Sequence, residues 1–179
     1  MNNRSVIELV STEFKKKKIP CVLIGGFALG FHKFQRTTMD IDFMISEVDL
    51  KLAQETLVNV GYKPYEKGEG LFVRFKSNSE ELMDLDLVLV EPETLKEIMN
   101  QGIRGKVGNL ELIVPKLEHL IAMKLHAIKN NPHRELNDLL DIVSLMRNND
   151  IDPRSNKIKE LCLKFGTAEV YEKIIRALS

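Results

Sequence analysis

Hydrophobic and polar positions along the chain predict an alternation of helices and strands. In the first part of the chain they predict a helix, a strand, a helix and a strand, over residues 4–18, 21–24, 27–34 and 39–45. Pro20 follows the first helix and ends it. Gly25-Gly26 separates the first strand from the second helix, because paired glycines interrupt regular structure.

The middle of the chain predicts a hairpin between two helices. In order, we expect a helix over 50–60, paired strands over 71–76 and 82–90, a helix over 92–102 and a strand over 110–114. Asp49 and Gly61 are of the residue types that favour the start and the end of a helix, respectively. Residues 62–70 are rich in glycine and lysine, so we expect a loop there.

The last third of the chain predicts only helices. They are expected from Pro115 through Ile128 and over residues 134–147, 153–165 and 168–178. Thr167 is a suitable N-cap for the last of them. A chain of 179 residues suits one compact domain, or a core with a small helical appendage.

The composition is that of a globular protein, with 44% hydrophobic and 29% charged residues. Lysine plus arginine and aspartate plus glutamate number 26 each, so the total charge requires no nucleic-acid partner, although local patches could bind one. The basic run Lys15–Lys18 fits a solvated helix end better than an RNA-facing patch.

Two cysteines, Cys21 and Cys162, argue against a disulfide framework and for a reducing, cytoplasmic location. The sequence has no signal-peptide pattern and no apolar run near the ~18 residues of a membrane span, so we expect no membrane partner.

Asp40 and Asp42 stand two residues apart in the predicted strand over 39–45 and therefore share one face of it. Carboxylates about 7 Å apart at the backbone, inside an apolar strand, repel each other and lose solvation. A divalent cation relieves both penalties, and Mg²⁺ is typically held by carboxylates together with substrate phosphates. The Gly25-Gly26 turn adds close backbone approach and a helix N-terminus, which suit a phosphate. The stretch therefore predicts a metal-plus-triphosphate site.

A second pair, Asp84 and Asp86, shares a face of the apolar strand over 82–90. A solvent-facing position in an alternating strand explains one of them equally well. Beside Asp40 and Asp42 the functional interpretation gains weight, and the strand register, which sequence fixes weakly, decides between the two.

Lys124 shares the apolar stripe of the helix that follows Pro115. Spacing alone favours a side chain that extends to the edge of the core over one that reaches a phosphate. Asp138 and Asp141, three residues apart in the next helix, are neighbours on one face. In isolation they predict an exposed acidic face that pairs with Arg134 or Lys124.

Gly-Gly followed by Asp-x-Asp on a strand resembles the signature of the nucleotidyltransferase superfamily with a polymerase-beta-like fold. The lead-in Arg36-Thr37-Thr38 resembles one branch, the AbiEii/AbiGii and MenT-type toxins. The later helices resemble the same branch, with a lysine, an arginine and Asp-x-x-Asp at Lys124, Arg134, Asp138 and Asp141. Asn137 departs from the pattern, since a basic residue is common there. The resemblance covers residues 20–147.

The resemblance implies an α+β polymerase-beta-like core, a mixed or antiparallel sheet flanked by helices, over residues 1–114. A C-terminal helical region over residues 115–179 would complete the active-site cleft. The implied enzyme moves an NMP from an NTP to a hydroxyl and releases pyrophosphate, with Mg²⁺ (or Mn²⁺) as cofactor. RNA such as tRNA is an implied acceptor and a cognate antitoxin an implied partner, although other members of the superfamily modify proteins or small molecules.

The resemblance also assigns residues. The metal would be held by Asp40, Asp42 and Asp86, because Asp86 opens the run Asp-Leu-Val-Leu-Val, with Asp84 as the fallback. The nucleotide would be bound by Gly25, Gly26, Arg36, Thr37 and Lys124. Asp138 would be a functional acid that orients Lys124. The alternative is a catalytically idle nucleotide-binding or protein-interaction module of the same fold, which the retained carboxylates disfavour.

Several other site types lack their sequence patterns. The chain contains no P-loop, no complete Gly-x-Gly-x-x-Gly and no Gly-x-Ser-x-Gly. The lack of His-Glu-x-x-His and of an Asp-x-Asp-x-Asp-Gly loop argues against zinc and structural calcium sites.

Overall fold

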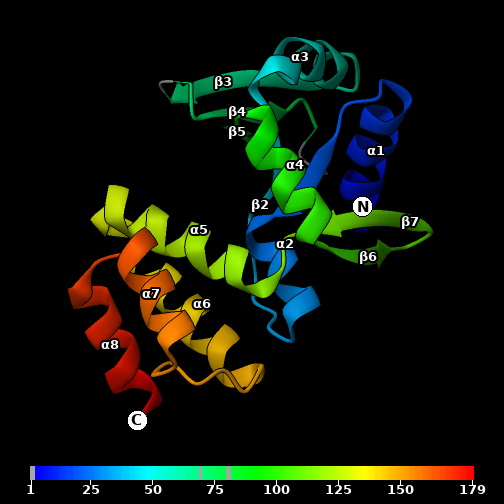
Figure 1. Ribbon diagram of the computed structural model, residues 1–179. Coiled ribbons are helices and arrows are strands. Elements are labelled where there is room, and N and C mark those ends of the chain that lie inside the picture. Colours follow the sequence, from blue (N-terminus) through cyan, green and yellow to red (C-terminus); the bar gives the residue numbers. More distant parts are fainter. Residues whose placement is uncertain (1–2, 69, 80–81) are drawn as a thin grey trace. The chain divides into compact units, whose positions relative to one another are not determined.

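The computed structural model describes residues 3–68, 70–79 and 82–179. The chain forms two compact units, one made of Met1–Phe31 with Gln35–Pro115 and the other of His32–Phe34 with Lys116–Ser179. Each unit is described by itself below, and Figure 1 labels the elements of both.

The first unit is built on a five-stranded mixed sheet with the order β1-β2-β5-β4-β3. Its strands are β1 (Cys21–Ile24), β2 (Asp40–Ser46), β3 (Tyr62–Gly68), β4 (Phe72–Ser77) and β5 (Asp84–Val90). The central pair β2 and β5 is parallel, and the other neighbours are antiparallel. This mixed sheet confirms the predicted fold class, and the paired β4 and β5 confirm the predicted hairpin.

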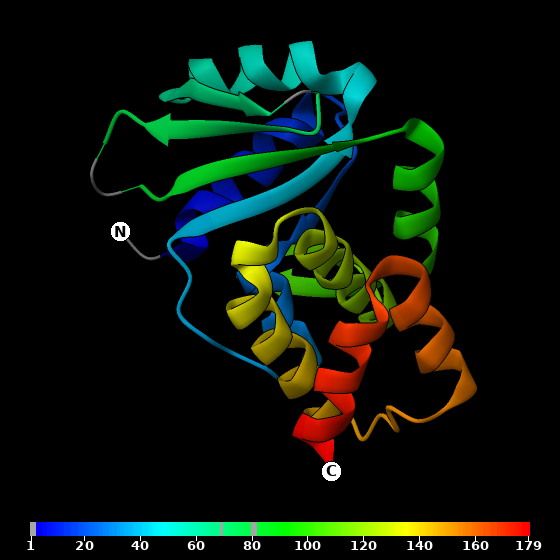
Figure 2. The same ribbon diagram turned by 90° about the vertical axis from the view of Figure 1, so that its left-hand side faces the viewer.

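One face of the sheet is the hydrophobic core of this unit. Alternation along β2 and β5 buries Ile41, Phe43, Leu85 and Leu87 completely. Helices α1 (Asn3–Lys16) and α3 (Leu50–Asn59) belong to this layer, which Figure 2 shows beside the strands. Phe14 of α1 packs against Phe43, with ring centroids 6.3 Å apart. Burial of each such side chain stabilises the fold by about 1.5–3 kcal/mol. Since side chains alternate along a strand, burial of these residues turns their neighbours in sequence toward the opposite face of the sheet.

The remaining elements of the first unit lie around β1 and β2. They are α2 (Gly25–Leu29), the 3-10 helices Gly30–His32 and Glu47–Asp49, α4 (Pro92–Gln101), β6 (Ile103–Val107) and β7 (Leu110–Val114). The 3-10 helix Gly30–His32 ends in the second unit. The strands β6 and β7 form a separate antiparallel hairpin, and β7 contacts β1. Helix α4 contacts β1 and β2 and begins at Pro92, as the sequence predicted.

One predicted loop is wrong, and one strand was missed. Residues 62–68 form the edge strand β3 rather than a loop, and β6 was not predicted. Five consecutive residues of β3 are exposed, so it lacks the alternation that identifies a half-buried strand. Only Tyr62 is fully buried, and an edge position tolerates Pro64, which has no N–H to donate.

The predicted helix over residues 27–34 is also wrong in extent. Helix α2 is only five residues long, starts at Gly25 and passes into a 3-10 turn at Gly30. Lys33 follows with a φ of 59°, a left-handed conformation that cannot continue a helix.

The second unit is helical. Its elements are α5 (Leu117–Asn130), the 3-10 helix Pro132–Arg134, α6 (Glu135–Asn148), α7 (Asn156–Phe165) and α8 (Ala168–Leu178). Helix α5 contacts α6 and α7, and α8 contacts the same two helices. The N-cap predicted at Thr167 is confirmed, since its Oγ1 accepts a hydrogen bond from the N–H of Val170 at 3.2 Å. Among the described residues, no helix has both the length and the apolarity that a membrane crossing needs.

Candidate active site

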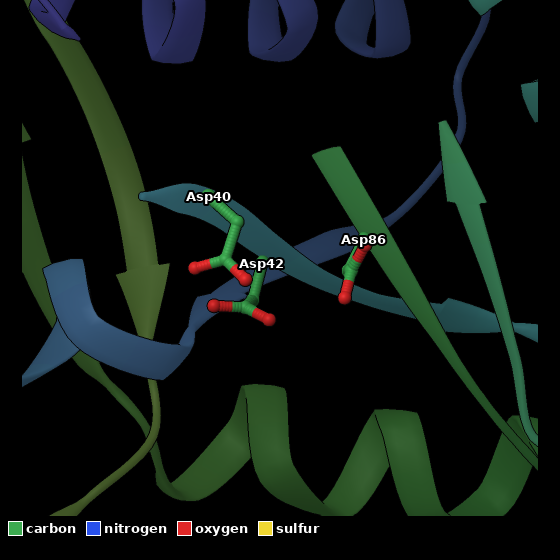
Figure 3. Close-up of side chains that lie close together, drawn as sticks. All are labelled: Asp40, Asp42 and Asp86. Atoms are coloured by element: carbon green, nitrogen blue, oxygen red, sulfur yellow. The ribbon is translucent and has the colours of Figure 1, made fainter. Parts of the chain in front are cut away.

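Three carboxylates converge on the sheet face opposite the α1–α3 core. Asp40 and Asp42 lie two apart on β2, and the parallel register places Asp86 of β5 directly opposite Asp42. Each carboxylate offers an oxygen within 4.8 Å of the others. Figure 3 shows the three side chains projecting to the same side of the two strands. We refer to Asp40, Asp42 and Asp86 as the acidic triad.

The acidic triad is electrostatically costly unless a cation offsets it. Burial raises the pKa of Asp86, the charge of Asp40 raises it further, and Arg74 partly opposes both effects. Three carboxylates at this spacing are the oxygen donors that hard divalent cations prefer. The triad therefore fits a divalent metal ion.

Asp84 lies on the same strand face but outside the triad. It stands opposite Asp40 in the β2–β5 register. Its Oδ1 accepts a hydrogen bond from the backbone N–H of Ser77 on β4 at 3.3 Å. Among the described residues, the carboxylate cluster that could hold a metal contains Asp86 and not the fallback Asp84.

The residues around β2 hold its aspartates closely. Thr38 Oγ1 donates a hydrogen bond to Asp40 Oδ1 at 3.0 Å. Gly25 has a φ of 65°, and a Cβ there would overlap the carboxylate of Asp42. A Cβ on Gly26 would lie 2.7 Å from the Thr38 side chain. Close packing against Asp42 and Thr38 therefore requires both glycines, independently of any phosphate.

A basic residue that the sequence analysis missed contacts the triad. Arg74 of β4 donates its Nε to Asp86 Oδ2 at 3.1 Å and its Nη1 to Glu66 Oε2 of β3 at 2.9 Å. The antiparallel register places Arg74 opposite Asp86. The Arg74–Asp86 pair is evident only from the strand register. The Arg74–Glu66 contact could not be expected from the sequence either, because residues 62–68 were predicted to be a loop.

Arg36 and Thr37, the predicted nucleotide-binding pair, lie in the connection that leads to β2. Both residues are exposed. The Nη1 of Arg36 donates to the carbonyl oxygen of Thr37 at 3.0 Å. The pair therefore presents polar side chains to solvent three and four residues before the triad begins at Asp40.

In the second unit, Lys124 is buried between two carboxylates. Its ammonium donates to Asp138 Oδ1 at 2.9 Å and to Asp141 Oδ2 at 2.6 Å. Arg134 Nε donates to Asp138 Oδ2 at 2.8 Å. Burial acts to raise the pKa of Asp138, but the hydrogen bonds and charges of Arg134 and Lys124 outweigh it and lower that pKa. We call these four residues the α5–α6 charge cluster.

The α5–α6 charge cluster corrects two expectations. Lys124 does not extend to the edge of the core, since it is only 8% exposed. Asp138 and Asp141 do not form an exposed acidic face, because both are buried, although the expected pairing with Arg134 and Lys124 is present. Asn137, the departure from the family pattern, is exposed and adjoins the cluster in sequence.

A family model described as "Uncharacterised nucleotidyltransferase" matches residues 3–178. No curated protein matches the chain. The match covers both the unit that carries the acidic triad and the helical unit.

Solved structures share the fold. ANT(2″)-Ia in complex with adenylyl-2″-tobramycin is 14% identical, with a TM-score of 0.66, and the match covers 90% of this chain and 95% of that chain. The lincosamide antibiotic adenylyltransferase LnuA with bound lincomycin is 15% identical, with a TM-score of 0.61 and coverage of 84% and 100%. The Megavirus polyadenylate synthase is 18% identical, with a TM-score of 0.58 and coverage of 86% and 33%. At these identities the likeness establishes the fold alone.

Proposed function

The chain belongs to the nucleotidyltransferase family whose model it matches, and from this premise we propose that its acidic triad performs Mg²⁺-dependent transfer of an NMP from an NTP to a hydroxyl acceptor. The observation that carries the proposal is the convergence of Asp40, Asp42 and Asp86, with carboxylate oxygens within 4.8 Å of one another. A nucleotidyltransferase fold with this triad intact is better suited to turnover than to idle binding.

Asp40, Asp42 and Asp86 would hold the metal. When bound, Mg²⁺ (or Mn²⁺) would offset the negative charge of the substrate phosphates and of the oxygens that attack and leave the α-phosphorus. Thr38 supports this arrangement by fixing one oxygen of Asp40, and Gly25 supports it by letting the backbone lie against Asp42.

Asp86 would also accept the proton of the attacking hydroxyl. The resemblance assigns this role to a carboxylate on the strand beside Asp40 and Asp42, and the strand register places Asp86 opposite Asp42. The acceptor oxygen would then form a bond to the α-phosphorus, and the bond to the leaving pyrophosphate would break.

Gly25, Gly26, Arg36 and Thr37 would bind the nucleotide. The resemblance adds Lys124 as a phosphate ligand and Asp138 as the acid that orients it. The Lys124 ammonium donates two hydrogen bonds, to Asp138 and Asp141, and its third N–H would contact the phosphate.

The acceptor class stays open between small molecules and RNA. The proteins of similar fold include an adenylyltransferase for lincosamide antibiotics and a polyadenylate synthase. Membership of the AbiEii-like toxin branch, with tRNA as acceptor and an antitoxin partner, is the more specific proposal. It rests on Arg36-Thr37 ahead of the triad and on the α5–α6 charge cluster.

The test is to supply each NTP, labelled at the α-phosphate, together with Mg²⁺ and one acceptor pool at a time. The pools are total tRNA, the protein alone and a mixture of hydroxylated small molecules. Label in one pool, with matching pyrophosphate release, identifies the acceptor and the nucleotide. NTP binding by calorimetry without transfer to any pool would instead favour the idle nucleotide-binding module.

A further inference from the structure

A row of four charged residues crosses four neighbouring strands, and two of the four belong to the acidic triad. Glu66 of β3 stands opposite Arg74 of β4, Arg74 stands opposite Asp86 of β5, and Asp86 stands opposite Asp42 of β2. Directly opposed residues share one face of a sheet and are its closest cross-strand neighbours. The only cation of this row therefore lies between a carboxylate outside the triad and one inside it.

The guanidinium of Arg74 is held on several sides. It contacts Glu66 through Nη1 and Asp86 through Nε, at 2.9 and 3.1 Å. It also lies over the ring of Phe72, 5.1 Å from the ring centroid. A planar guanidinium presents its N–H donors in fixed directions. A guanidinium that is held in place therefore also fixes the carboxylate that it contacts.

From this geometry we propose that Arg74, anchored by Glu66, is a positioning residue for Asp86. The inference rests on the proposed function, since it assigns the support of a triad carboxylate. Without a fixed partner, Asp86 would turn away from Asp40 and Asp42, because like charges at this spacing repel. The hydrogen bond to Oδ2 prevents that rotation and leaves the carboxylate aimed at the metal position. Outer residues that orient metal ligands in this way typically affect metal affinity or activity about 10- to 100-fold.

Glu66 has a separate task in this arrangement. The positive charge of Arg74 by itself opposes the binding of a divalent cation nearby. The Glu66 carboxylate offsets the charge of Arg74 and holds its guanidinium in place. Glu66 is exposed, with 46% of its side chain accessible, so its contribution is the modest one of a surface ion pair.

The experiment is a Mn²⁺ titration followed by electron paramagnetic resonance, on the full chain and on Arg74→Met, Arg74→Lys and Glu66→Gln. Arg104→Met is the matched control, because Arg104 also pairs with a carboxylate, Glu111 of β7, but lies on the separate β6–β7 hairpin. Melting temperatures restrict the comparison to folded protein. Transfer rates then provide kcat and the KM for the NTP.

Arg74→Met is expected to weaken Mn²⁺ binding and to lower kcat about 10- to 100-fold, with the KM for the NTP changed much less. Arg74→Lys should remain clearly weaker than wild type, because a lysine retains the charge without the fork. Glu66→Gln should weaken Mn²⁺ binding about 2- to 5-fold, and Arg104→Met should leave it unchanged.

Charge alone makes the opposite prediction for Arg74→Met, since removing a cation beside the triad should tighten Mn²⁺ binding. Tighter or unchanged binding in that variant, or wild-type binding in Arg74→Lys, would overturn the positioning role. If the wild type binds Mn²⁺ but transfers no nucleotide, the titration still decides the role of Arg74, while the proposed function fails. If the folded wild type binds no Mn²⁺, both proposals fail.

Discussion

Gly25 illustrates how single residues shape the candidate site. Its backbone is left-handed, and its missing side chain leaves room for the carboxylate of Asp42. Thr38 and Arg74 each donate a hydrogen bond to a triad carboxylate. The geometry of the acidic triad thus depends on residues that hold no metal themselves.

Gly25→Ala should displace Asp42 and reduce nucleotide transfer about 100-fold, the scale expected when a catalytic group moves by about 1 Å. The new Cβ would overlap the Asp42 carboxylate, so Mn²⁺ affinity should fall in parallel. Electron paramagnetic resonance and initial rates measure the two effects.

Gly61→Ala is the matched control, because Gly61 also has a positive φ, of 96°, but nothing lies within 4 Å of a Cβ placed there. It should cost about 1 kcal/mol of stability through backbone strain and leave Mn²⁺ affinity unchanged. Equal losses of Mn²⁺ affinity in both variants would show that backbone strain, rather than the overlap with Asp42, is responsible.

At the scale of elements, the strands show what the sequence could predict. The spacing of Asp40 and Asp42 identified one face of β2, because side chains alternate with a period of two on any strand. The choice between Asp84 and Asp86 needed the positions of the carboxylate oxygens across the paired strands β2 and β5, which are far apart in the chain and leave no local pattern. Arg74 and Glu66 were missed for the same reason.

The helices show a different limit. Their apolar stripes predicted α5 and α6 closely, but the position of Lys124 on such a stripe indicated a side chain that reaches solvent. The structure buries it because α6 supplies two carboxylates, Asp138 and Asp141. A partner on another helix decides whether a charged residue on an apolar stripe is buried, and helical spacing does not report it.

Asp138→Asn tests the α5–α6 charge cluster through the pH dependence of unfolding. The lowered pKa of Asp138 means that its charge stabilises the folded state above the usual aspartate value of 3.8. That contribution is lost as the pH falls through the lower pKa of the folded state. At neutral pH the variant should lose about 3 kcal/mol, since a buried ion pair loses one partner.

Denaturant unfolding of wild type and Asp138→Asn across pH measures this difference. The gap in unfolding free energy should stay constant above about pH 5 and narrow below about pH 4. Glu160→Gln, an exposed carboxylate on α7, should show no such gap. A gap that widens on acidification would contradict the assigned direction of the Asp138 pKa.

At the scale of the whole molecule, ligand binding should be visible as stability. A ligand that binds only the folded state adds about 2.7 kcal/mol at a concentration 100 times its Kd. For a chain of 179 residues that corresponds to a rise in Tm of about 5–10 °C. We expect this rise when an NTP and Mg²⁺ are added together.

Thermal unfolding of wild type and of the Asp40→Asn, Asp42→Asn variant, each with and without the NTP and Mg²⁺, measures the effect. The variant should lose most of the rise, because the metal and the phosphates attached to it no longer bind. The same rise in both proteins would place NTP binding away from the acidic triad.

The central claim is that the acidic triad transfers a nucleotide, and the most direct test is the fate of an α-phosphate label. Purified wild type and the Asp40→Ala, Asp42→Ala variant receive each labelled NTP, Mg²⁺ and the acceptor pools. We predict covalent label in one pool with wild type and none with the variant. Equal label with both proteins would contradict the function assigned to the stretch from Gly25 to Asp42. The absence of both nucleotide transfer and NTP binding in the wild type would contradict it as well.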